Sequence, residues 1–130
     1  MVMKILNNIK QDLPGLLDYI IFYNTGIVFQ STCPEKANVP AICANLNEII
    51  KIFKQSLSCY DNTSNEYQKI IFETQKYITI ILKLGKNSNL ALFFDKEVVD
   101  EVNIRPIQEN LSKLEELIDM DKGDLDPSSS

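Results

Sequence analysis

The residues best able to act as nucleophiles in this 130-residue sequence are three cysteines, and none has the neighbours that such chemistry requires. Cys33, Cys43 and Cys59 show no Cys-x-x-Cys spacing, and the sequence contains no histidine for a Cys-His pair, a Ser-His pair or a zinc site. Cys33 is followed by Pro34 and Glu35, an acidic setting that does not stabilise a thiolate. We interpret the cysteines as reduced, unreactive thiols of a cytosolic protein.

Two further motifs have the residue types of phosphate chemistry but the wrong context. Gly85-Lys86 resembles the end of a phosphate loop, but the upstream glycine is missing and Asn87 replaces the serine or threonine. It precedes an expected strand, so we interpret it as a hairpin turn. Arg105, the only arginine, stands just before Pro106, a position typical of a helix start and not of an arginine finger.

Two pairs of carboxylates are the last candidates for catalytic residues. Glu115-Glu116 and the pair Asp119/Asp121 fall on a helix end and the tail that follows it, where a solvated face is the simpler interpretation. The sequence therefore predicts no catalytic residue, no metal site and no cofactor, and it favours a protein that works by binding.

The charge and composition limit the kind of partner. Thirteen basic and eighteen acidic residues give a net charge of −5, which argues against a nucleic-acid binder. No apolar run has the length of a signal-peptide core or of a bilayer span, so we expect a cytoplasmic protein. We expect one domain over residues 1–120 and a disordered acidic, serine-rich tail over 121–130.

Hydrophobic periodicity predicts the elements that would position a binding surface. Apolar residues at helical spacing from Val2 to Leu13 predict a first helix, which Pro14-Gly15 ends. Leu16–Tyr23 and Ile27–Gln30 then read as two strands around an Asn-Thr-Gly turn. Three more strands are expected at 67–73, 77–84 and 90–95, and a last helix from about Pro106. The predicted order is α-β-β-α-β-β-β-α.

The second helix has the clearest pattern, with three kinds of face. A stripe expected to be buried contains Ile42, Leu46, Ile49, Ile50, Phe53 and Leu57. The opposite, polar face contains Ala44, Glu48, Lys51, Gln55 and Ser58. Between them lies a flank of Ala41, Ile52 and Cys59, which is more apolar than a solvated face requires.

This order resembles the roadblock family, and local features agree over the range 4–118. The Asn24-Thr25-Gly26 turn stands where the family has an acidic residue and glycine, and Gln30-Ser31 leads through a Cys-Pro-Glu loop to the long helix. The resemblance implies an α/β (α+β) fold with a single antiparallel five-stranded sheet. It places the long second helix on one face and the terminal helices on the other. The connection 96–103 departs from the family, because it is longer and more acidic than the usual Gly-Leu connection.

The resemblance also implies dimerisation through the third strand, with a copy of itself or a roadblock paralogue. The dimer interface expected on this basis contains Ala41, Ile52, Tyr67, Lys69, Ile71 and Glu73. A monomer whose apolar flank has no function is the alternative.

The implied function is that of a non-enzymatic scaffold or regulator of a small Ras-like GTPase, which at most assists hydrolysis by that partner. By the same resemblance, paired second helices would contact the GTPase through Glu48, Lys51, Ile52, Gln55, Ser58 and Cys59. An adaptor light-chain subunit of a motor or trafficking complex, a longin-like module and a small-molecule sensor are the alternatives. The helical stripe at Val2–Leu13 counts against the longin-like module, which usually begins with a strand.

Overall fold

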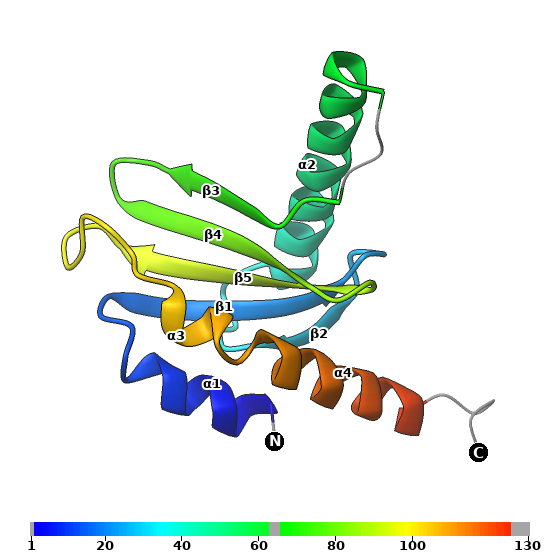
Figure 1. Ribbon diagram of the computed structural model, residues 1–130. Coiled ribbons are helices and arrows are strands. Elements are labelled where there is room, and N and C mark those ends of the chain that lie inside the picture. The colour runs from blue at the N-terminus through cyan, green and yellow to red at the C-terminus, as the bar shows by residue number, and fades with distance from the viewer. Residues whose placement is uncertain (1, 63–65, 126–130) are drawn as a thin grey trace.

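The chain forms one five-stranded antiparallel sheet with helices on its two faces (Figure 1). The computed structural model describes residues 2–62 and 66–125. The sheet order is β2-β1-β5-β4-β3, so β2 and β3 are the edge strands. Its strands are β1 (Leu16–Tyr23), β2 (Val28–Ser31), β3 (Lys69–Glu73), β4 (Tyr77–Leu84) and β5 (Ser88–Asp95).

Helix α2 (Val39–Tyr60) packs on one face of the sheet, and the terminal helices pack on the other (Figure 1). The terminal helices are α1 (Val2–Lys10), α3 (Arg105–Gln108) and α4 (Leu111–Leu125). Side chains alternate between the two cores, as strand geometry requires. In β1, Ile21 packs under the terminal helices, whereas Ile20 and Phe22 pack against α2. The predicted α+β fold and order of elements are confirmed.

Local sequence explains where α2 begins. The side chain of Asn38 accepts a hydrogen bond from the backbone N–H of Ala41 at 3.2 Å, which satisfies a free amide of the first turn. Pro40 lies in that same turn, where its missing N–H costs nothing. The Gly85-Lys86 motif forms the β4–β5 turn, with Gly85 at φ +65°, so its interpretation as a hairpin turn is confirmed.

Several boundaries differ from the sequence-based predictions. The third strand begins at Lys69 and not at Tyr67, whose side chain is buried in the core. The last helix is two helices, with a turn at residues 109 and 110 between them, where the side-chain amide of Asn110 donates to the Pro106 carbonyl at 2.8 Å. Helix α4 extends to Leu125, five residues into the expected tail, and residues 126–130 lie outside the described part of the chain.

The buried stripe predicted for α2 is only partly buried. Cys43, Leu46 and Ile50 are buried, but Ile49 is 38% exposed and Phe53 41% exposed, so the prediction was wrong for these two. The reason is length: 22 residues of α-helix span about 33 Å, whereas five strands are only about 19 Å wide. The C-terminal half of α2 therefore extends past β3 (Figure 1).

A polar network fixes the segment between α2 and β3. The hydroxyl of Tyr67 donates to Asn89 Oδ1 at 2.5 Å, and the Asn89 amide donates to the Phe22 carbonyl at 3.3 Å and to Asn24 Oδ1 at 3.1 Å. Lys83 Nζ donates to Asn24 Oδ1 at 2.8 Å and lies 5.8 Å from the centre of the Tyr67 ring. Burial raises the pKa of Tyr67 and lowers that of Lys83.

A second buried tyrosine lacks such partners. Tyr19 is 1% exposed, and its hydroxyl has no hydrogen-bond partner among the described residues. Burial raises the pKa of Tyr19 as well, so it stays protonated at neutral pH. A buried hydroxyl without a partner destabilises the folded state.

The two tyrosines should therefore respond oppositely to removal of the hydroxyl. Tyr67→Phe leaves a buried Asn89 oxygen without its donor and should lower the free energy of unfolding by about 1–3 kcal/mol. Tyr19→Phe removes an unpaired group and should leave that free energy unchanged or raise it. Urea unfolding of the two variants beside the wild type measures both effects. An equal loss in both variants would contradict the assigned network.

Candidate functional site

The exposed apolar residues of α2 lie on one side of the helix. Ile52 is 53% exposed and Tyr60 88% exposed, in addition to the partly exposed Ile49 and Phe53. Their spacing of three, four and eleven residues from Ile49 places them on one flank. The opposite flank lies over the β1–β2 turn, since a Cβ at Gly26 would be 3.6 Å from the Ala44 Cα. The apolar flank therefore faces away from the β1–β2 turn.

Strand β3 provides a free backbone edge beside this flank. It pairs only with β4, so its outer amides and carbonyls have no strand partner among the described residues. Ile70 and Phe72 pack on the α2 side, whereas Ile71 faces the other way and is 54% exposed. An unpaired edge beside exposed apolar residues is typical of a site that another chain covers. We call this combination of the apolar α2 flank and the β3 edge the α2–β3 surface.

The residues expected at a dimer interface fall into two groups. Ala41 and Ile52 are exposed on α2, and Lys69, Ile71 and Glu73 are exposed on β3. Tyr67 instead precedes the strand and is buried, so its side chain is not part of the surface. Sequence reasoning missed the exposed Ile49, Phe53 and Tyr60. The 22-residue length of α2 is the signal that would have found them.

The residues expected to contact a GTPase all lie on α2, and all six are exposed: Glu48, Lys51, Ile52, Gln55, Ser58 and Cys59. Lys51 and Glu48 approach to 4.0 Å, a loose surface pair that leaves both charges available. The Ser58 hydroxyl donates to the Lys54 carbonyl of its own helix at 3.1 Å. The four polar members recur at spacings of three and four residues, so they form one continuous polar row.

The α2 side of the sheet is not fully covered. The core beneath α2 contains residues such as Phe22 and Ile81, toward one end of the strands. At the other end Leu17 and Tyr77 are exposed, and Phe93 is only partly buried. An apolar part of the sheet therefore remains open beside the helix.

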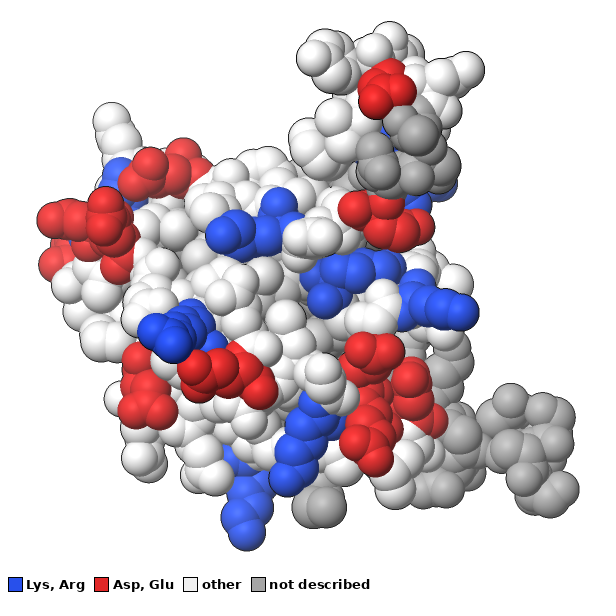
Figure 2. Space-filling model, in the orientation of Figure 1, with Lys and Arg blue, Asp and Glu red and all other residues white. Residues whose placement is uncertain are grey.

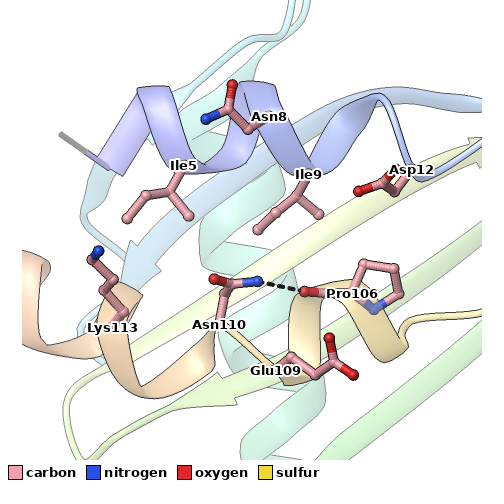
Figure 3. A pocket seen from close by; sticks show the side chains of 8 residues that line it. All are labelled: Ile5, Asn8, Ile9, Asp12, Pro106, Glu109, Asn110 and Lys113. Atoms are coloured by element: carbon pink, nitrogen blue, oxygen red, sulfur yellow. Dashed lines mark hydrogen bonds between the residues drawn. The ribbon is translucent and has the colours of Figure 1, made fainter.

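A groove of about 360 Å³ separates α1 from α3 and α4 on the opposite face (Figure 3). Ile5 and Ile9 point into it from α1, and Pro106, Glu109, Asn110 and Lys113 line the other side. The Asn110 amide is already bonded to the Pro106 carbonyl. We interpret this groove as the packing seam of the terminal helices.

Residues 2–62 and 66–125 contain neither a cluster suited to a metal ion nor a helix suited to a bilayer. No cluster of three or more cysteine, aspartate or glutamate residues there has the arrangement of a metal site. Within the same ranges, no helix combines the length and the apolar character needed to cross a membrane.

Comparison with solved structures identifies the architecture. The gliding protein MglB from Thermus thermophilus superposes with a TM-score of 0.72 over 88% of this chain and 86% of its own, at 12% identity. A Roadblock/LC7 domain from Streptomyces avermitilis gives 0.68 over 88% and 92%, at 10% identity. The chain has the roadblock fold. MglB from Myxococcus xanthus is also similar, with a TM-score of 0.69 over 92% and 89% at 12% identity.

The structure shows the roadblock fold at a sequence identity of only 12% to MglB from Thermus thermophilus. No protein-family model matches the sequence, and neither does any curated protein sequence. Sequence identities of 10% and 12% establish only that the fold is shared. The function must therefore be argued from the surface of this chain.

The three thiols differ in burial and therefore in expected reactivity. Cys43 is fully buried in the core beneath α2, and this burial, together with nearby Cys33, raises the pKa of the Cys43 thiol to about 11. Cys33 is partly buried and Cys59 is exposed on α2.

Iodoacetamide at about pH 8 should therefore modify Cys59 first, Cys33 more slowly and Cys43 only after unfolding, because alkylation requires an accessible thiolate. Because the pKa of Cys43 is raised to about 11, its thiolate fraction remains small until the pH approaches that value. Mass spectrometry of timed samples, with a urea-unfolded control, gives the order. Rapid modification of Cys43 in the native protein would contradict this packing.

Proposed function

We propose that the protein is a non-enzymatic, dimeric scaffold or regulator that binds a small Ras-like GTPase through its paired α2 helices. The α2–β3 surface is the observation that supports this proposal most strongly. It combines a free strand edge with an apolar helix flank that extends past the sheet, and an open apolar part of the same sheet face lies beside it. These three features complement one another when two copies meet.

A two-fold axis beside β3 would join the two sheets edge to edge. The two β3 strands would then satisfy each other's free backbone groups. The part of α2 that extends past β3 would reach over the partner's sheet, where Leu17 and Tyr77 are exposed. Such a contact is isologous, since each copy gives the same residues to the other. A roadblock paralogue with the same three features could replace the second copy.

The paired helices would leave their polar rows exposed for another protein. Glu48, Lys51, Gln55 and Ser58, with Ile52 and Cys59 beside them, form the proposed GTPase contact. The resemblance to roadblock regulators supports this choice, as does the likeness to MglB proteins, one of which was solved "with tetrameric arrangement". We expect this interaction in the cytoplasm.

The position of the only arginine supports a non-enzymatic role. Arg105 lies on α3, on the opposite face of the sheet from α2, and its Nε is 3.2 Å from Glu109 Oε1. It therefore lies far from the proposed contact and is already paired. Any effect on GTP hydrolysis would come from positioning the partner's own residues.

Disruption of the α2–β3 surface should dissociate the proposed homodimer into monomers. Phe53→Asp places a charge in the proposed interface and should weaken self-association by roughly a hundredfold or more, because a charge without a partner is costly to bury. Ser58→Asp, on the polar row of the same helix, is the matched control and should leave association unchanged. Sedimentation equilibrium measures both constants. Equal constants for wild type and Phe53→Asp would show that this surface is not the interface.

Charge reversal tests the GTPase contact separately. The double variant Glu48→Lys/Lys51→Glu preserves net charge and should lower affinity for the cognate GTPase about tenfold, a typical effect of charges at the rim of an interface. Glu116→Lys/Lys4→Glu, on the terminal helices, is the control of equal net charge. Calorimetry against a panel of Ras-like GTPases loaded with GDP or a GTP analogue gives the affinities. Equal affinity for the GDP-loaded and the GTP-analogue-loaded GTPase would instead indicate an adaptor subunit.

A further inference from the structure

A second exposed apolar feature lies beside β3, on the face of the sheet opposite α2. It is a pocket of about 290 Å³ between the edge of the sheet and the connection from β5 to α3. It is lined by Ile71, Glu73, Ile78, Ile80, Asp100, Glu101 and Val102. We call it the β3 pocket. Three of its lining residues, Asp100, Glu101 and Val102, belong to the acidic connection that sets this sequence apart from the roadblock pattern.

The floor of the β3 pocket is aliphatic and only partly covered. Ile78 and Ile80 of β4 are buried in the core under the terminal helices. Ile71 pairs with Ile80 across the strands, but it is 54% exposed, because β3 is the outermost strand. An aliphatic side chain placed in this pocket would therefore cover Ile71 and extend the existing core.

The rim of the β3 pocket is acidic. Its charged residues are Glu73, Asp100 and Glu101, and no basic residue lines it within the described part of the chain. Lys96 Nζ lies 2.9 Å from Glu73 Oε1, but Asp100 and Glu101 are exposed and have no ion pair among the described residues. Acidic side chains gather at this end of the molecule, where the β5–α3 connection lies (Figure 2). A cationic side chain bound at this rim would therefore contact two carboxylates that have no ion pair, above an apolar floor.

We propose that the β3 pocket binds an extended segment of a partner protein in which a lysine or arginine alternates with an aliphatic residue. The aliphatic side chain would contact Ile71, and the cation would bind Asp100 and Glu101. The charge of the rim selects against acidic segments and nucleic acid, and the floor selects against a purely polar basic segment. The pocket faces away from α2, so this site does not depend on GTPase binding.

Three peptide probes separate these contributions. Acetylated Lys-Val-Lys-Val-Lys-Val should shift the Ile71, Ile78 and Ile80 methyl signals in ¹³C NMR of the full chain, and the effect should weaken as salt screens the rim. The same peptide with glutamate for lysine, or with glycine for valine, should bind roughly fivefold more weakly or worse. Equal binding of the lysine and glutamate peptides would overturn the proposal.

Variants locate the site. Asp100→Lys/Glu101→Lys should remove binding of the lysine–valine peptide, and far-ultraviolet circular dichroism should confirm that the fold is kept. Glu35→Lys/Glu116→Lys changes the net charge equally at positions elsewhere and should preserve binding. Loss of binding in both double variants would show a general charge effect, which overturns the assignment to this pocket. Binding that persists in Asp100→Lys/Glu101→Lys would overturn it too.

Discussion

The main constraint on this molecule is that its longest helix is longer than the sheet beneath it is wide. A five-stranded sheet buries only the first half of α2, where Cys43, Leu46 and Ile50 meet the core. The second half retains an apolar flank but has no sheet of its own chain to cover it. The free edge of β3 begins where that cover ends. The length of one element thus creates an open strand edge and an exposed apolar helix flank at the same place.

A helix that extends past its sheet needs other contacts to hold its direction. Lys54 Nζ lies 2.8 Å from Glu66 Oε1, which connects the middle of α2 to the segment before β3. The hydrogen bond from Lys54 is the main reason that the pKa of Glu66 is lowered, so the pair stays charged at neutral pH. Tyr67, next in sequence, fixes this segment to Asn89 in the core. An exposed ion pair alone contributes little to stability. Here the pair lies next to the buried Tyr67–Asn89 hydrogen bond, which fixes the segment to which α2 is connected.

The order of elements could be predicted because each element carries its own periodicity. The position of Ala41, Ile52 and Cys59 on a flank between the two faces follows from helix geometry alone, and the structure shows all three exposed. The exposure of Ile49 and Phe53 could not be predicted in this way: periodicity shows which side of a helix is apolar, but not where the sheet below it ends. The role of Tyr67 depends on Asn89, 22 residues away, and so on tertiary structure. The acidic connection was visible in the sequence, but only the structure places Asp100 and Glu101 beside an exposed isoleucine.

The solution mass of the wild-type chain tests the central claim, that the α2–β3 surface is made for a second copy. Light scattering at micromolar concentration should give twice the chain mass of 14.8 kDa, because the free edge and the exposed helix flank are then covered together. A mass of 14.8 kDa across the micromolar range would contradict the proposed homodimer and require a different protein to cover this surface.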